Sequence, residues 1–239
     1  MRNSQRAIVG LLGIVVGLMV VVAIWVWATG ERPPELLGER TTRTYDYADF
    51  DGVSVAGQWQ VTIERGDAWR VSVEVPGEYT DQVRVERIGD VLNLAYPFRF
   101  GGFSRGGFGR VDRQRPFQAT ITMPALETLG LVGASQLSFS GFEGGALSLH
   151  VSGATDLTGA ASRFDALTLY LSGAGRVNLA DVPVTDANVD ISGATSVTLR
   201  MAGGRLSGDL SGTANLEYFG TVSEESVEKS GFVNVRRRD

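Results

Sequence analysis

The chain has 239 residues, of which 43% are hydrophobic, and its 22 lysine and arginine residues against 27 aspartate and glutamate residues give a net charge of −5 at pH 7. This length is ample for one domain with its own core, and the acidic balance gives no reason to expect a nucleic-acid partner. Because the chain has no cysteine and a single histidine, disulfides, cysteine nucleophiles, acylated lipoprotein anchors and histidine-based zinc sites are excluded.

The amino-terminal segment has the pattern of a membrane anchor. Residues 1–6 carry two arginines, and residues 7–28 follow without a charge, which is long enough to cross a bilayer as a helix. Positive charge before the span predicts a single-pass signal anchor in the cytoplasmic membrane, with the amino terminus in the cytoplasm and the rest outside it, in the periplasm or at the cell surface. A signal peptide cleaved after Ala28 is the alternative, although the apolar run exceeds the usual length of such peptides.

Residues 29–40 predict a short linker, because they combine a Pro-Pro pair with several charged residues. Everything from 41 to 239 then forms one exported domain. From 41 to 96, apolar and polar residues alternate in short runs, and the runs are broken at glycine or at Pro-Gly. We expect strands that form irregular opening coils and cover one end of the domain.

Residues 97–116 differ in character, because they are rich in glycine and phenylalanine and carry five arginines. Such a composition cannot continue the strand alternation. Arg-Gly-Gly segments occur in RNA-binding tails, but an exported segment meets little RNA. We therefore expect a mobile loop inserted between strands, with arginines that could contact an anionic glycan or a lipid headgroup.

A phrase related to Ser-Gly-Ala returns at a fixed period through the second half of the chain. Its copies start 20, 20, 20, 19 and 19 positions apart, at Leu131, Val151, Leu171, Ile191, Leu210 and Lys229. Such a period is typical of stacked repeat architectures. Within each period apolar residues alternate with polar ones and no helical segment appears. We therefore predict an all-β fold, a single-stranded parallel β-helix (β-solenoid) with about 20 residues per coil, right-handed by the preference of parallel crossovers.

In such a stack, equivalent residues lie above one another at about the strand spacing of 4.8 Å. The glycine column is then a corner where the backbone turns, and the serine column beside it can hydrogen-bond the turn or its stacked neighbours. A catalytic role is not expected, because equivalent serines in five coils cannot all be nucleophiles. These corner residues are Gly133, Gly153, Gly173, Gly193, Gly212, Gly231, Ser152, Ser172, Ser192, Ser211 and Ser230.

One outward column collects ionisable side chains: His150, Tyr170, Asp190, Asp209 and Glu228 precede successive copies of the phrase. Stacked carboxylates repel one another unless a cation lies between them, and oxygen ligands suit Ca²⁺. Two close carboxylates also serve retaining glycosidases. The alternative is a solvated face without a ligand. We expect no cofactor, no metal and no catalytic residue, and if a metal or catalytic site exists, Asp190, Asp209 and Glu228 are its candidates.

The chain also resembles a known bacterial family. Residues 50–57 are Phe-Asp-Gly-Val-Ser-Val-Ala-Gly, residues 61–67 are Val-Thr-Ile-Glu-Arg-Gly-Asp, and residues 123–126 are Met-Pro-Ala-Leu. Together with the spaced Ser-Gly-Ala phrases, they make the sequence from 47 to 235 similar to the head-GIN domain of putative autotransporter adhesins. The resemblance implies a β-helical domain of the cell envelope with no established activity and no catalytic residues to transfer. The loop at 97–116 departs from the short connection that the family would have there.

These observations predict a non-catalytic, membrane-anchored extracytoplasmic β-solenoid that acts as a binding, adhesion or envelope scaffold module. Its partners would be the membrane, through the amino-terminal helix, and a protein or glycan ligand. The alternative is a β-helix enzyme that acts on envelope or extracellular polysaccharide, by analogy of fold. A convergent cleft around Asp190 and Asp209 would favour the enzyme, whereas a flat acidic face would favour binding.

Overall fold

The computed structural model describes residues 40–96 and 116–238 of the chain. These ranges are all-β apart from one short 3-10 turn, η2 (Gly77–Tyr79). The predicted anchor at 7–28 and nearly all of the predicted loop at 97–116 lie outside them. Within the described ranges, no helix is long and apolar enough to cross a membrane.

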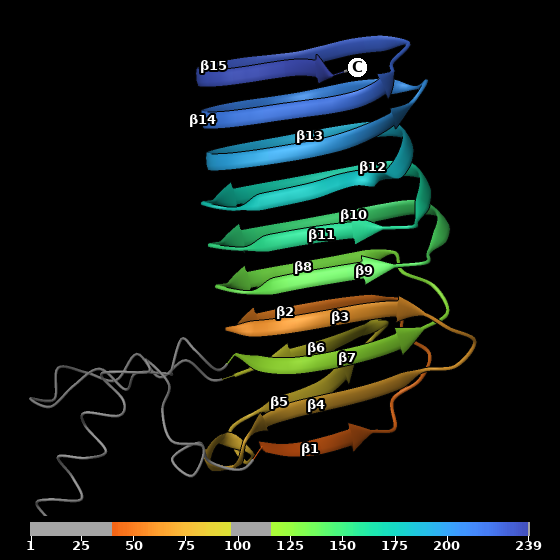
Figure 1. Ribbon diagram of the computed structural model, residues 1–239, viewed down its shortest axis with the longest axis vertical. Coiled ribbons are helices and arrows are strands. Elements are labelled where there is room, and N and C mark those ends of the chain that lie inside the picture. The colour runs from red at the N-terminus through yellow and green to blue at the C-terminus, as the bar shows by residue number, and fades with distance from the viewer. Residues whose placement is uncertain (1–39, 97–115, 239) are drawn as a thin grey trace, which may run out of the picture. The chain divides into compact units, whose positions relative to one another are not determined.

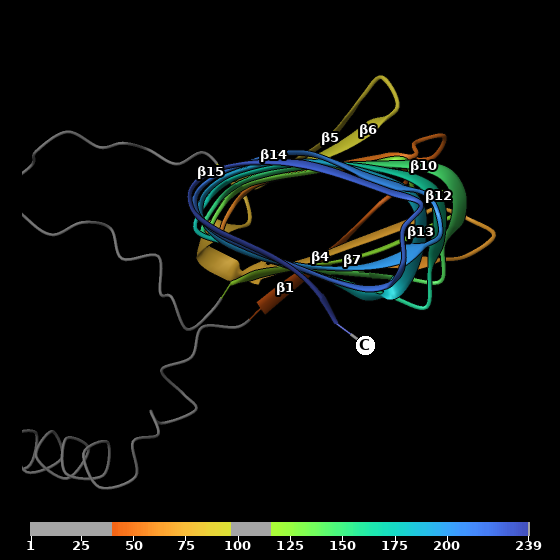
Figure 2. The ribbon, with the colours of Figure 1, turned by 90° about the horizontal axis from the view of Figure 1, so that it is seen from above.

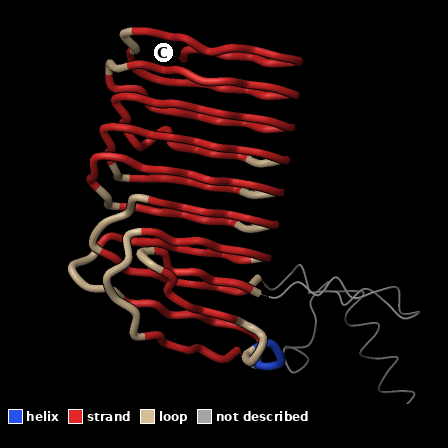
Figure 3. The backbone as a smooth tube through the Cα atoms, turned by 180° about the vertical axis from the view of Figure 1, so that it is seen from behind, coloured by secondary structure: helices blue, strands red, loops and turns tan. Residues whose placement is uncertain are grey.

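The strands stack into a β-solenoid of about 6 turns with ~20 residues per coil, which confirms the predicted all-β solenoid and its period. Each coil contributes to two flat faces (Figures 1 and 2), and the loops are confined to the ends of the coils (Figure 3). Face A contains, in spatial order, β5 (Arg84–Ile88), β6 (Val91–Ala95), β2 (Gly52–Gly57), β8 (Thr128–Gly133), β10 (Glu143–Gly153) and β12 (Arg163–Gly173). Face B contains β1 (Arg40–Tyr45), β4 (Arg70–Pro76), β7 (Phe117–Met123), β3 (Trp59–Arg65), β9 (Gln136–Ser140) and β11 (Asp156–Ala160).

Three long strands complete both faces, because each continues around a corner. They are β13 (Arg176–Ala202), β14 (Arg205–Thr221) and β15 (Glu224–Arg238). The pairing is parallel from β2 and β3 to β15, and equivalent residues of successive coils are direct ladder partners. A column in the sequence is therefore a column in space.

The space between the two faces is filled by the apolar members of each alternating strand. In β12, Leu167, Leu169 and Leu171 point inward and are at most 2% exposed, whereas Tyr170 between them is 44% exposed. Leu149 of β10 and Val189 of β13 are the ladder partners of Leu169 and are also fully buried. Burial of these continuous apolar columns stabilises the domain by about 25 cal/mol for each Å² of apolar surface removed from water.

The corner from face A to face B is built on a column of glycines. Gly193 has φ 108°, and a Cβ atom there would lie 2.2 Å from the carbonyl oxygen of Gly173 in the coil below. The same carbonyls accept hydrogen bonds from the next coil; for example, the Ala174 N–H donates to the Gly153 oxygen at 2.9 Å. A side chain at this corner would therefore need both a disfavoured backbone conformation and room that the neighbouring coil occupies.

The order of the first coils along the chain differs from their order in the stack. β2 and β3 form a regular rung, and the chain then builds β6 and β7 on one side of that rung, while β8 and β9 pair with its other side. Gly57 is consequently the ladder partner of Gly133 and shares its positive φ. The prediction of irregular opening coils was thus wrong for β2 and β3, since the glycine column begins there without a serine beside it.

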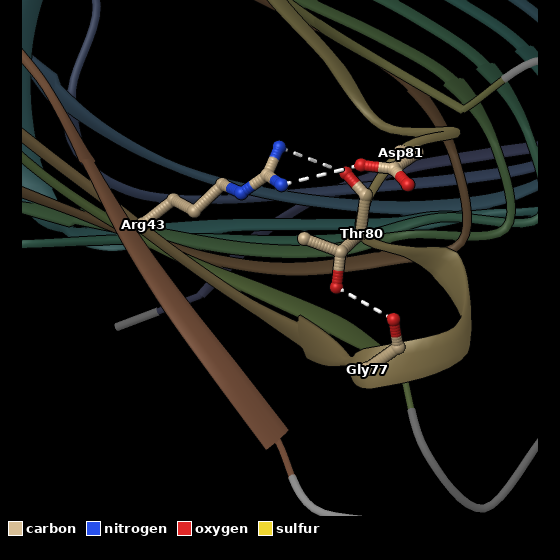
Figure 4. A network of polar contacts seen from close by, with 4 residues as sticks. All are labelled: Arg43, Gly77, Thr80 and Asp81. Atoms are coloured by element: carbon tan, nitrogen blue, oxygen red, sulfur yellow. Dashed lines mark hydrogen bonds and ion pairs between the residues drawn. The ribbon is translucent and has the colours of Figure 1, made fainter.

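Antiparallel strands cover the first end of the stack, as expected for an end that must not expose a free edge. β4 pairs antiparallel with β7, β1 with β4, and β5 with β6. η2 is tied to β1, because the Arg43 guanidinium donates to the Thr80 carbonyl at 3.1 Å and lies 3.3 Å from the Asp81 carboxylate (Figure 4). The Thr80 hydroxyl in turn donates to the Gly77 carbonyl.

The other end of the stack is β15, whose inward positions carry charges. Glu225, Lys229 and Arg237 occupy the columns that hold Leu206, Leu210 and Tyr218 in β14. Charges that point inward on an edge strand oppose edge-to-edge pairing. The Tyr218 hydroxyl donates to the Glu225 carboxylate at 2.6 Å, and burial together with this hydrogen bond raises the pKa of Tyr218 to about 12.

We predict that Gly193→Val lowers the free energy of unfolding by about 3 kcal/mol or more, because a β-branched side chain would be strained at positive φ and would collide with backbone. Asp190→Ala, three residues earlier and outward-facing, should change it by less than about 0.5 kcal/mol. Urea unfolding of both variants measures the difference. Equal stability of the two variants would contradict the corner assignment.

Tyr218 should make stability depend on alkaline pH. Its pKa is raised from 10.0 to about 12, so the folded state holds the proton more tightly than the unfolded state, and this stabilisation is complete below pH 10 and lost as the pH approaches 12. Tyr218→Phe should cost about 1 kcal/mol at pH 7 through the lost hydrogen bond. The free energy of unfolding of the variant should then fall less than that of the parent between pH 10 and 12; parallel pH profiles would refute the assignment.

Candidate binding site on face A

The structure places the column of ionisable residues on the outer surface of face A. His150, Tyr170, Asp190, Asp209 and Glu228 come from β10, β12, β13, β14 and β15, and each is the ladder partner of the next. Strand alternation turns them outward, because the residues on both sides of each one occupy the inward columns, which are apolar in β10, β12 and β13 but include Gly208 in β14 and Lys229 in β15. The column therefore runs along the stack and crosses one strand per residue.

The two aromatic members of the column form a stacked pair. The ring centroids of His150 and Tyr170 are 5.0 Å apart, and the ring planes differ by 16°. The His150 Nε2 atom is also 3.0 Å from the Ser148 hydroxyl. Stacking and the hydrogen bond hold the imidazole in one orientation, so this part of the face is rigid and pre-organised for a contact.

A shallow depression of about 360 Å³ lies beside the stacked pair. His150, Tyr170 and Asp190 line one side of it, and Val132 of β8 lines it as well. Val132 is 56% exposed and Tyr170 is 44% exposed, and both are among the few large apolar or aromatic side chains that this domain leaves in water. The depression thus offers apolar contact area beside the outward serines and the column of ionisable residues.

Serines of the repeated phrase form the other side of the depression. Ser152, Ser172 and Ser192 all line it, and the Ser172 hydroxyl donates to the Ser152 hydroxyl at 3.2 Å. Val132 occupies the same column one coil earlier, where it is the ladder partner of Ser152. In the sequence, the copy that starts at Leu131 has Val132 where the later copies have serine, and this difference is a signal that could have drawn attention to the residue.

The three carboxylates are not brought together around one cavity. Asp190 lines the depression, whereas Asp209 and Glu228 lie further along the stack and do not. Among the described residues, no ion pair or side-chain hydrogen bond involves any of them, and no group of three or more histidine, aspartate and glutamate side chains is placed to hold a metal ion. A glycosidase needs two carboxylates that flank one cleft, and this arrangement does not provide them.

Comparisons with known proteins place this chain in a family. The model of the putative auto-transporter adhesin, head GIN domain, family matches residues 49–222. A putative adhesin from Bacteroides fragilis has the same fold, with a TM-score of 0.59 and 14% identity over 84% of this chain and 97% of that one. No curated protein matches the sequence.

Two Parabacteroides structures are less similar. A putative adhesin from Parabacteroides merdae gives a TM-score of 0.47 with 15% identity, over 84% of this chain and 97% of that one. A protein from Parabacteroides distasonis described as a putative lipid binding protein gives 0.49 with 16% identity, over 84% and 98%. At these identities, the likeness to solved structures concerns the fold alone.

Proposed function

The chain belongs to the family of putative auto-transporter adhesin head GIN domains, and from this premise we propose that it is a non-catalytic binding module that attaches a partner protein through face A. The observation that carries the proposal is the exposed cluster of Val132, His150 and Tyr170 on a rigid surface. Aromatic anchors surrounded by small polar residues are the usual energetic centre of protein interfaces. The serines around the depression supply that polar rim.

We further propose that the module is held at the cytoplasmic membrane and displayed outside it. The uncharged run at 7–28 supports an anchor, and the Pro-containing stretch at 29–40 supports a linker. The described domain begins with β1 at Arg40, at the end of the stack opposite to β15 (Figure 1).

Binding is favoured over catalysis on polysaccharide by the shape and chemistry of face A. The depression is shallow and open, and it contains one carboxylate rather than a pair. A hydrolase would need an acid and a base or nucleophile that flank a bound sugar. Release of reducing ends from an envelope polysaccharide by the purified chain, lost in Asp190→Ala, would instead support the enzyme.

Site-specific cross-linking in the cells that make the protein tests this proposal. A photo-reactive amino acid at Ser152, which lines the depression, should give a discrete protein adduct, whereas the same group at Thr158 on face B should not. The double variant Tyr170→Ala, Val132→Ser should lower the yield of the Ser152 adduct about tenfold, because the apolar contact is removed. The melting temperature of this variant should equal that of the parent. Ile88→Ser, which alters a 62% exposed aliphatic residue in β5 that does not line the depression, is the matched control.

Extraction of membranes from the same cells tests the proposed membrane anchor. After a carbonate wash, the adduct should stay with the membrane fraction, because a spanning helix resists extraction. Equal cross-linking from Ser152 and Thr158 would contradict binding through face A, and equal loss in the Ile88 control would contradict binding through the depression. Full release by the wash would contradict the anchor while leaving the binding proposal standing.

A further inference from the structure

A second and larger depression, the corner groove, lies at the corner between the glycine column and face B, away from the face A depression. Its volume is about 570 Å³. One wall is the first outward column of face B, from Asp156 through Arg176 to Asn215 and Asn234, and the exposed Phe232 belongs to the opposite wall. From Asp156 to Asn234 the wall crosses four strand spacings, or about 19 Å.

The groove exists because the residues that follow the corner glycines are small. Ala174 and Ala194 make a low wall, and the floor between the walls consists of Gly175, Thr195 and Ala214. Thr195 is 6% exposed, and its hydroxyl has no hydrogen-bond partner among the described residues. A buried hydroxyl without a partner is costly, so the floor retains an unsatisfied polar group.

The backbone of the groove is not free to recognise a ligand. The Arg176 N–H donates to the Thr155 carbonyl at 2.9 Å, and the Ser196 N–H donates to the Gly175 carbonyl at 3.1 Å. These hydrogen bonds join neighbouring coils and use the donors that a peptide strand would need for main-chain pairing. A ligand cannot pair with the backbone at these positions, so recognition in this groove must come from side chains.

Arg176 supplies a positive charge to the groove wall. It is exposed and takes part in no ion pair or side-chain hydrogen bond among the described residues, although Asp156 is its ladder partner. Two other arginines of the last coils are engaged, Arg205 with Glu224 and Arg238 with Glu217, both at 2.7 Å. A guanidinium without a partner binds a carboxylate through two parallel hydrogen bonds.

The far end of the groove combines an aromatic ring with amides. Phe232 is 87% exposed, the most exposed large hydrophobic side chain of the described domain. The Asn234 side chain donates from Nδ2 to Oδ1 of Asn215 at 2.8 Å, which fixes both amides and leaves the Asn234 Oδ1 atom as an acceptor. An exposed ring can cover the apolar face of a sugar, while fixed amides meet its hydroxyl groups.

From these contacts we propose that the corner groove binds an acidic polysaccharide whose sugars carry carboxylates, that is, a polyuronate. Arg176 pairs with a sugar carboxylate, Asn215 and Asn234 bind hydroxyl groups, and Phe232 packs on a ring at the end of the bound segment. This site is separate from face A and does not depend on the function proposed for that face.

Binding of oligogalacturonate to the full-length chain in detergent, measured by calorimetry at 0.15 M salt, tests the site, with a neutral dextran oligosaccharide as the comparison ligand. Arg176→Gln should weaken binding about tenfold or more, because a hydrogen-bonded charge pair is lost. Phe232→Ala should weaken it about fivefold through lost ring contact. Arg163→Gln, at an exposed arginine outside the groove, is the matched control and should bind like the parent.

Absence of oligogalacturonate binding by the parent, or equal binding of dextran, would overturn the proposal. So would an equal loss in Arg163→Gln, which would indicate general charge attraction. Circular dichroism and melting temperature verify that each variant is folded. Tyr170→Ala should leave this binding intact, so failure at the groove and failure at face A can be told apart.

Discussion

The close contact between stacked corner glycines is the constraint on which the rest of the structure depends. A Cβ atom at Gly153 or Gly193 would lie 2.2 Å from the carbonyl oxygen of the glycine one coil below. The coils can approach this closely only because the column has no side chains, and the approach lets corner amides bond to corner carbonyls. The corner thereby fixes the register of every coil, and an error of one residue would turn the whole apolar column outward.

A fixed register leaves the outward columns free to vary, and two exceptions in those columns mark the candidate sites. Val132 occurs in a column that otherwise contains serine in later coils, and it lines the face A depression. Phe232 occurs in a column of alanine and threonine, and it lines the corner groove. In a repeat protein, a residue that breaks its column without serving the core is a strong candidate for a binding role.

The regular part of this fold could be predicted from the sequence, because a period of 19 or 20 residues with alternating apolar positions has few physical solutions. The order of the first coils could not be predicted, since nothing in the pattern shows that β9 pairs with β3 rather than with β7, the face B strand that precedes it. The sequence also could not show that Asp190 lies beside the depression and Asp209 away from it, because this depends on contacts between neighbouring columns. Spacing along the chain fixes each column but does not show which side chains leave a hollow between them.

Amide hydrogen exchange at the corner tests the central claim most directly. The N–H groups of Ala134, Ala154 and Ala174 donate to the carbonyls of the corner glycines one coil below, at 2.8 to 2.9 Å. They should therefore exchange as slowly as the amides of the buried strands, with opening free energies near that of global unfolding. Exchange as fast as in the β5–β6 turn at 89–90, outside the ladders, would show that the corner is not the element that holds the coils in register.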